Sequence, residues 1–274
     1  MDANKKATVL LLDNSVQVDR IKTGERSRYL ADVISKFDFT VATGISLLEF
    51  KAVVIQECIT IHNALRRTNA RFSVVRDQLL ESTHRQSRLR AHIFNNVIQV
   101  FASSFEITDA ADIRLAEKAR LALELHIPRL YRWFRSSVDS ILEDDIQCNR
   151  ANEPPVKKLA AFSTNLPVCK RGTNKTCFVE KFVRLKLPTT LPQITAVCES
   201  STQLQRSAEL FEELSVSLDR EWTHHDCRSA GDCLIAFEGT QHATHAASTN
   251  RTEWEPLSTI LGFELIKIEY PKRK

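Results

Sequence analysis

The sequence predicts an α/β protein whose mostly parallel central sheet is built from both ends of the chain, with a mainly helical insertion between them. Short continuous apolar runs at both ends are typical of buried strands, and helical patterns alternate with them. Only 6 Gly and 8 Pro occur among 274 residues, which favours long helices over many short strands. Hydrophobic residues make up 43% of the chain, enough for a sizeable core.

The first three elements are expected to be a strand, a helix and a strand. Residues 7–15 (ATVLLLDNS) are a brief apolar run that ends in polar residues, as a buried strand does. Residues 23–36 have the spacing of an amphipathic helix, and residues 37–43 (FDFTVAT) are typical of a second strand. These segments predict a βαβ unit at the start of the chain.

The middle of the chain is expected to be mainly helical. A helical pattern starts at Ser46 and continues, with one break, to about Phe105. Two further helices are predicted over residues 107–125 and 128–144, since Pro128 is typical of a helix start.

A long connection is expected next, over residues 149–195, because five of the eight prolines fall there. Within it, CFVEKFVRLKL at 177–187 has the look of a short strand.

The C-terminal segments return to the α/β pattern. We expect a helix near 202–221, then a helix that starts in SAGDCLIAFEG at 229–239. A strand over 242–248 (HATHAAS), a short helix over 255–262 and a closing strand over 263–268 (FELIKI) follow.

Three segments summarise this organisation. Residues 1–60 and 206–274 are predicted to be the two halves of one α/β domain. Residues 61–205 are predicted to be the helical insertion, with a basic connecting segment.

Several function classes are excluded or disfavoured by the sequence. No stretch approaches the ~18 uninterrupted apolar residues of a membrane span. Seven irregularly spaced cysteines do not form a disulfide framework, so we expect reduced thiols in the cytoplasm and no membrane association. No glycine-rich phosphate loop and no G-x-S-x-G elbow occurs, which counts against nucleotide-binding enzymes and serine hydrolases.

Carboxylate and amide side chains follow several of the predicted strands. Asp13 ends the first strand, Glu49 lies in the first turn of the helix after the second, and Asp232 starts a helix. Asn250 and Glu253 come directly after the strand at 242–248. Because ligands of open parallel sheets bind beyond the carboxyl ends of the strands, we expect these side chains to converge there.

The segments LLDNS, GISLLEF, GDCLIAFEG and STNRTEWEPLSTILGFELIKI together resemble the PIN-domain nucleases, which include the VapC-type toxins. The resemblance covers roughly residues 7–60 and 225–268, and the large middle part departs from a compact PIN domain. It implies a three-layer α/β/α fold and a nuclease that uses Mg²⁺ or Mn²⁺. Substrate and biological role do not carry over.

The resemblance also implies roles for individual residues. Asp13, Glu49 and Asp232 match the acids that hold the metal, and Asn250 matches the amide variant of the fourth catalytic position. Ser15 matches the small polar residue two positions after the first acid. Hard divalent cations prefer such oxygen ligands, and a metal-activated water would attack the phosphate.

Two more acids are auxiliary candidates, Asp226 and Glu253. Structural alternatives stay open for the main ones: Asp232 as a helix N-cap, Glu49 in a capping box with Ser46, and Asn250 in a turn. The His and Cys residues of THHDC and TQHATH lack the spacing of a zinc site.

Basic residues are unevenly distributed, although the net charge is only +4. They concentrate in residues 62–92 and 151–190, while acids concentrate in 199–226. Such basic segments suit a nucleic acid, and solvated helix faces are the alternative. The candidate phosphate contacts are Arg67, Arg71, Arg85, Arg88, Lys170 and Arg171.

The sequence thus favours a metal-dependent endoribonuclease with RNA as its substrate. A weakly active or inactive scaffold that binds RNA or protein is the alternative, because Asn250 replaces an acid. A structure-specific DNA nuclease is a third hypothesis. An inhibitor or antitoxin protein and a second copy of the chain remain open as partners.

Overall fold

The computed structural model describes residues 7–21, 25–67, 69–81, 90–91, 93, 109–143, 146, 148–158, 161–162, 177–197, 202–217 and 219–270. The chain divides into two compact units. The first unit consists of Met1–Phe50, Arg135–Asn152 and Val168–Lys274. The second unit consists of Lys51–Phe134 and Glu153–Pro167.

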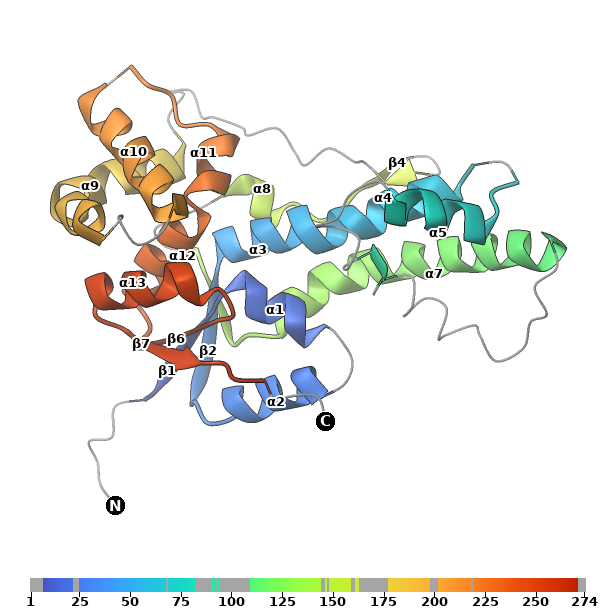
Figure 1. Cartoon of the computed structure of the whole chain (residues 1–274), viewed down its shortest axis with the longest axis horizontal. Helices are drawn as coiled ribbons and strands as arrows, with labels where there is room; N and C mark the ends of the chain where they lie inside the picture. Colours follow the sequence, from blue (N-terminus) through green and yellow to red (C-terminus); the bar gives the residue numbers. More distant parts are fainter. Residues whose placement is uncertain are drawn as a thin grey trace. The chain divides into compact units, whose positions relative to one another are not determined.

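The first unit is built on a five-stranded sheet in the order β3-β2-β1-β6-β7 (Figure 1). Its strands are β1 (Val9–Leu12), β2 (Phe39–Thr43), β3 (Ser140–Leu142), β6 (His245–Ser248) and β7 (Glu264–Lys267). Every pairing is parallel. The predicted α/β class with a parallel sheet drawn from both ends of the chain is therefore confirmed.

The central strand β1 explains why the sheet is buried. Leu10, Leu11 and Leu12 are all 0% exposed. A strand covered by helices on both faces needs a continuous apolar run rather than an alternating one. In the register, Leu11 lies beside Val41 of β2 and Ala246 of β6.

The sheet has a topological switch point between β1 and β6. The chain proceeds from β1 to β2 and β3 in one direction, then returns to place β6 on the other side of β1. At such a point the loops after the two neighbouring strands diverge, which leaves a crevice beyond their carboxyl ends. The residues that follow β1 and β6 are therefore the natural ones to bind a ligand.

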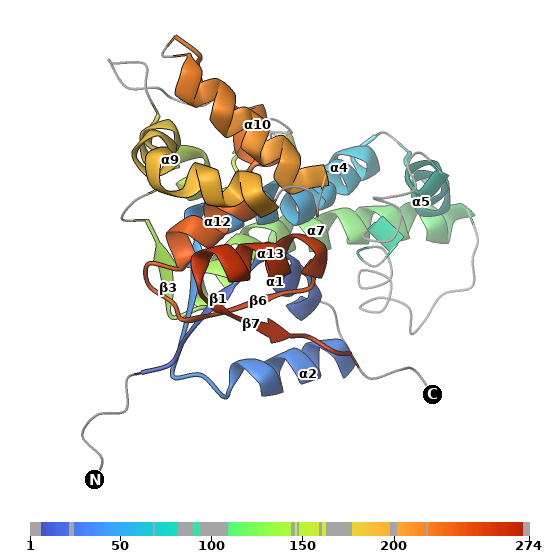
Figure 2. The ribbon, with the colours of Figure 1, turned by 60° about the vertical axis from the view of Figure 1, so that its left-hand side comes forward.

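Helices cover both faces of this sheet, as a three-layer arrangement requires. α2 (Glu25–Ile34) lies on one side, while α12 (Gly231–Gly239) and α13 (Arg251–Leu261) lie on the other (Figure 2). Between β1 and α2 the chain forms α1 (Asn14–Arg20), and α3 (Gly44–Phe50) follows β2 directly. Two short helices, α8 (Asn149–Asn152) and α11 (His224–Ser229), complete the surroundings of α3 and α12.

The predicted helix break at Pro128 is wrong. A single helix, α7 (Asp109–Ser136), contains Pro128 in its interior. Interior proline removes a backbone hydrogen bond at a cost of about 3 kcal/mol. Ile127, Leu130 and Phe134 are buried around it at helical spacing, and burial of this apolar stripe offsets that cost.

The last part of the predicted helix over 128–144 is a strand instead. The helix ends at Ser136, and β3 then pairs with β2 through Val41–Ser140 and Thr43–Leu142. Three residues are too few to show a period of two, so only the sheet edge offered by β2 decides their conformation.

The strand-like segment at 177–187 is helical instead. It forms the start of α9 (Phe178–Val197), with two prolines inside the helix. Val179, Phe182 and Val183 are buried, which is the i, i+3, i+4 spacing of a helix face. The neighbouring α10 (Thr202–Val216) packs against α9 and ends five residues before the predicted boundary at 221.

The described part of the second unit is mainly helical, as expected for the insertion. It contains a π-helical turn (Lys51–Ile55), α4 (Gln56–Leu65), α5 (Phe72–Glu81) and most of α7. A two-stranded ladder joins β4 (Lys157–Lys158) to β5 (Ala161–Phe162). The units differ from the predicted segments because β3, α9 and α10 belong to the first unit.

Two expectations about the whole chain concern membranes and cysteines. Among the described residues, no helix combines the length and the apolar character that crossing a membrane requires. The cysteines described in the structure are free thiols: Cys58, Cys148, Cys177, Cys227 and Cys233.

Candidate functional site

Asp13 lies at the switch point, directly after β1, and is only 2% exposed. Its carboxylate caps α1 by accepting from the Ser15 backbone N–H at 3.2 Å. The hydroxyls of Ser15 and Ser248 donate to the same oxygen at 2.5 and 2.8 Å. These donors hold Asp13 at the edge of the sheet without any positively charged partner.

Ser248 joins the ends of β1 and β6 and was not found by the sequence analysis. Besides its bond to Asp13, its oxygen accepts from the Asn250 N–H at 3.0 Å, and Ser15 accepts from the Thr249 N–H at 3.0 Å. The Asp13 N–H donates to Ala247 at 3.1 Å. The loops after both strands are thereby fixed around one carboxylate.

Glu49 projects from α3, which begins directly after β2. The start of this helix is satisfied by Thr43, whose hydroxyl oxygen accepts from the Ser46 N–H at 3.1 Å. The alternative of a capping box between Ser46 and Glu49 is therefore not what the structure shows. The Glu49 carboxylate is left to approach the start of α12.

Gly231 makes that approach sterically feasible. A Cβ atom at this position would lie 2.0 Å from Glu49 Oε1. Asp232 follows in the first turn of α12, where the N-cap is Ala230 and no side-chain cap bond forms. Asp232 therefore does not cap the helix, and the alternative reading of this aspartate is wrong. Gly231 instead leaves room for the Glu49 carboxylate, and Asp232 adds a second carboxylate. Negative charge is favoured at a helix N-terminus.

Asn250 connects Asp232 to Glu253. Its Nδ2 donates to Asp232 Oδ2 at 3.0 Å and also to Glu253 Oε2. Asp232 and Glu253 thus accept hydrogen bonds from the same amide group. In this arrangement Asn250 serves as a donor that draws two acids together, whereas the sequence analysis assigned it an acceptor role.

We call Asp13, Glu49, Asp232 and Glu253 the carboxylate cluster. Asp13 and Glu253 are buried, at 2% and 8% exposure, whereas Glu49 and Asp232 are partly exposed. The cluster thus has a buried side, with Asp13 and Glu253, and a solvent-accessible side, with Glu49 and Asp232. The three acids predicted as metal ligands are brought together from the ends of three different segments.

The electrostatics of the cluster are those of crowded like charges. Desolvation, followed by repulsion from Asp232, raises the pKa of Asp13 to about 6. Desolvation and the charges of Asp232 and Asp13 raise the pKa of Glu49 well above its usual value. The pKa of Asp232 is raised by desolvation and by its hydrogen bond with Glu253. The fold keeps acids together although each disfavours ionisation of the next.

The chemistry of the cluster fits a hard divalent cation. All the side-chain donors are carboxylate, amide or hydroxyl oxygens, the ligands that Mg²⁺ and Mn²⁺ prefer. Among the described residues, no three His, Cys, Asp or Glu side chains lie close enough together, as the structure stands, to hold a metal ion. Mg²⁺ sites commonly use one or two carboxylates and keep several waters, so an open cluster is compatible with such an ion.

Among the described residues, Arg228 supplies a positive charge near Glu49. Arg228 of α11 is exposed, and its charge lowers the pKa of Glu49. The sequence predicted basic residues near the acids in 62–92 and 151–190 and not at Arg228. Its only signal in the sequence is its position four residues before Asp232.

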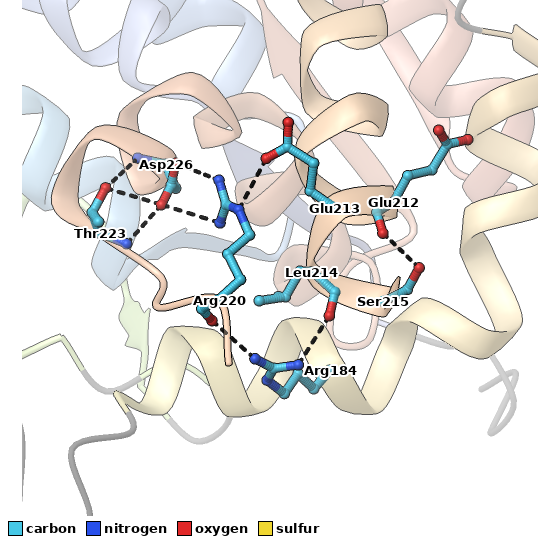
Figure 3. Close-up of polar contacts among 8 residues, drawn as sticks. All are labelled: Arg184, Glu212, Glu213, Leu214, Ser215, Arg220, Thr223 and Asp226. Carbon is cyan, nitrogen blue, oxygen red and sulfur yellow. Dashed lines mark hydrogen bonds and ion pairs between the residues drawn. The ribbon is translucent and has the colours of Figure 1, made fainter. Parts of the chain in front are cut away.

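Asp226 does not belong to the carboxylate cluster, so its assignment as an auxiliary acid is corrected. Its carboxylate accepts from the Thr223 N–H at 2.7 Å and from the Thr223 hydroxyl at 2.9 Å, which completes a capping box for α11 (Figure 3). Arg220 Nη2 donates to it at 3.2 Å. Arg220 also pairs with Glu213. Burial raises the pKa of Asp226, but the bonds from Thr223 and Arg220 outweigh it and lower that pKa. Asp226 therefore stabilises the start of α11.

None of the predicted phosphate contacts belongs to the described part of the first unit. Arg67 is exposed at the end of α4, and Arg71 lies just before α5, both in the second unit. Arg85, Arg88, Lys170 and Arg171 lie outside the described residues. A role for these residues in binding RNA stays a prediction.

Comparisons with models of protein families, with curated proteins and with solved structures found no match for this chain.

Two glycines of α12 make opposite predictions for substitution by alanine. At Gly231 the added Cβ meets the end of a partly exposed Glu49, which can move away, so stability should change by less than about 1 kcal/mol. At Gly239 it meets Leu11 Cδ2 at 2.2 Å in the buried sheet, so Gly239→Ala should cost about 1–3 kcal/mol. Urea unfolding of both variants measures the difference. Equal losses would show that Glu49 is as firmly held as Leu11.

The metal-free protein should lose stability as pH rises. Asp13 has a folded pKa of about 6 against 3.8 in an unfolded chain, so the folded state binds more protons between these values. The contribution is present below pH 3.8 and is lost as pH rises through 6, by about 3 kcal/mol for this group alone. Thermal unfolding in EDTA from pH 4 to 8 measures the fall.

Two matched Asp→Asn variants test whether repulsion within the carboxylate cluster causes this loss of stability. Asp232→Asn removes one charge of the cluster and should raise the unfolding temperature at pH 8. Asp139→Asn should lower it, since the pKa of Asp139 is lowered by donors from Thr40, the N–H at 2.7 Å and the hydroxyl at 2.8 Å. The same sign for both variants would contradict repulsion within the cluster.

Proposed function

We propose that this chain is a PIN-type, metal-dependent endoribonuclease that hydrolyses phosphodiester bonds of RNA. The observation that carries the proposal is the carboxylate cluster itself. Four acids from the segments after β1, in α3, in α12 and in α13 meet beyond the carboxyl ends of parallel strands, next to a topological switch point. Open α/β sheets bind their ligands at this position.

A purely structural role for the cluster is disfavoured by its energetics. Buried acids that stabilise a fold are normally paired with cations, as Asp226 is with Arg220. The direct hydrogen-bond donors to Asp13 are neutral, and the neighbouring acids raise its pKa. Clusters of this kind occur where a function requires them, and a divalent cation removes the repulsion.

Each residue then has a distinct role. Asp13, Glu49 and Asp232 hold the cation, while Ser15, Ser248 and Asn250 fix the orientation of the acids. Glu253 supports Asp232 from the buried side. A bound Mg²⁺ or Mn²⁺ lowers the pKa of a water nucleophile and neutralises charge that develops on the phosphate.

The substrate meets the cluster on its solvent-accessible side. Attack of water on phosphorus forms one P–O bond and breaks the bond to the leaving ribose oxygen. Arg228 is placed to contact a phosphate oxygen next to the acids, because it is exposed and close enough to Glu49 to lower its pKa. A polyanion approaches acids only where such positive charges offset the repulsion.

The second candidate function is an RNA- or protein-binding scaffold that does not cleave. It is favoured by one observation. Asn250 donates hydrogen bonds to two acids, whereas the resemblance places a fourth metal ligand at this position. An inhibitor protein or a second copy of the chain would then be the partner. A nuclease that acts on structured DNA is the third hypothesis, and the cleavage assay below tests it as well.

Cleavage should depend on Asp13. With labelled RNA in Mg²⁺ or Mn²⁺, Asp13→Asn should lower the rate roughly 100-fold or more, because the variant loses a charged ligand but keeps its size and capping oxygen. EDTA should abolish cleavage by the wild type. Labelled DNA in parallel reactions separates the RNA and DNA hypotheses.

Asp77→Asn is a matched control, since Asp77 is exposed and pairs with Arg76 in the second unit. It should cleave as the wild type does. RNA binding without cleavage by the wild type would favour the scaffold. Cleavage by Asp13→Asn at the wild-type rate would reject the proposed site.

Arg228 should affect substrate binding more than turnover. Arg228→Gln should raise KM for RNA severalfold and reduce the slope of log affinity against log salt by about 0.7, the value of one contact to single-stranded phosphate. Arg26→Gln is the control, because Arg26 stacks on Tyr270 at 4.5 Å and belongs to α2 on the other side of the sheet. An unchanged salt slope for Arg228→Gln would assign this arginine to a solvated surface.

A further inference from the structure

The last part of α7 carries an exposed row of one apolar and two basic side chains. Leu125, Arg129 and Arg132 are spaced at i, i+4 and i+7, which places them on one face of the helix. All three are exposed, and Leu125 is 61% exposed. Residues 125–136 contain no acid, and neither arginine has an ion-pair partner among the described residues. We call these three residues the basic row.

α10 carries an exposed row of the opposite charge, formed by Glu209, Glu212 and Val216. Val216 is 86% exposed, although it is apolar. The neighbouring Glu213 pairs with Arg220 at 2.9 Å, whereas the Glu212 carboxylate points away from that pair (Figure 3). We call Glu209, Glu212 and Val216 the acidic row.

The two rows match in spacing when the helices run antiparallel. In the basic row the arginines follow the leucine by four and seven residues, or about 6 and 10.5 Å of helix. In the acidic row the glutamates precede the valine by the same four and seven residues. An antiparallel pair of helices that brings the leucine onto the valine therefore places a glutamate opposite each arginine. The resulting pairs are Leu125–Val216, Arg129–Glu212 and Arg132–Glu209.

We propose that the basic row of one copy of this chain docks on the acidic row of a second copy. In a symmetric dimer each copy contributes both rows, so the contact occurs twice. The apolar pair removes two exposed side chains from water, while the ion pairs fix the register and the choice of partner. This contact is independent of the carboxylate cluster and of the proposed nuclease function.

The apolar member of the basic row favours a protein partner over a nucleic acid. A phosphate backbone would pair with the two arginines but would place charged oxygens against Leu125. Bases of single-stranded nucleic acids stack on aromatic side chains, and the basic row has none. RNA is therefore the competing occupant that the experiment has to separate.

The test is sedimentation equilibrium of the full chain at low salt over a range of protein concentrations. The wild type should self-associate and should dissociate as salt rises, because salt screens exposed charges. Arg129→Glu/Arg132→Glu reverses the basic row, and Glu209→Arg/Glu212→Arg reverses the acidic row. Each double variant should raise the dissociation constant at least about 10-fold, because like charges then face each other across the contact.

Two rescue experiments identify the contact itself. An equimolar mixture of the two reversed variants should form a heterodimer with about the affinity of the wild type. In that heterodimer one contact pairs the two reversed rows, and the other pairs the two original rows. A single chain that carries both reversals should self-associate for the same reason.

Arg28→Glu/Lys36→Glu is the matched control. Both residues are exposed, in α2 and just after it, and the double change alters the net charge as much as reversal of the basic row does. Its dissociation constant should equal that of the wild type. All the substituted residues are exposed, so each variant should fold, and circular dichroism checks this before sedimentation.

The outcomes are distinct. A wild type that stays monomeric at low salt would overturn the proposal, as would dimers that the reversals do not weaken. Failure of both the mixture and the doubly reversed chain to regain affinity would show that the two rows do not meet. Loss of labelled RNA binding in the variant with a reversed basic row, at an unchanged dissociation constant, would assign that row to RNA instead.

Discussion

Repulsion among carboxylates held at one point of a parallel sheet is the constraint on which the rest of the first unit depends. Neutral donors offset part of this cost: the hydroxyls of Ser15 and Ser248 serve Asp13, and the Asn250 amide serves the pair of Asp232 and Glu253. These contacts give orientation without cancelling charge. They leave the negative charges of the acids uncancelled, which is costly in a buried position and is typical of functional sites.

Backbone geometry brings the acids together with few specialised residues. Because parallel strands end at the same edge, each segment after β1, β2 and β6 begins its helix there. Asp13 lies directly before its helix, whereas Glu49 lies near the end of α3 and not in the first turn that the sequence predicted. Gly231 is the exception, since any larger residue would meet Glu49. A site of this kind therefore depends on strand order more than on any one contact.

The sequence predicted what local pattern and order can determine. The apolar run of β1 and the acids Asp13, Glu49 and Asp232 were identified because each lies at a recognisable strand or helix boundary. The helical state of 177–187 was missed because a short alternating segment fits both periods, and only packing against α10 decides between them. Ser248 and Arg228 were missed because their importance comes from neighbours more than 170 residues away in the chain, which no local pattern reveals.

The pairing of β1 with β6 affects when the carboxylate cluster can form during synthesis. Leu11 and Ala246 are register partners, so the central strand lacks a neighbour on one edge until the residues of β6 have left the ribosome. Contacts of such long sequence separation form late and slowly. During synthesis, the nascent chain carries Asp13 and Glu49 without Asp232, and the acids remain an incomplete set. The order of translation thus delays the meeting of Asp13 and Glu49 with Asp232 until the residues of α12 and β6 have been synthesised.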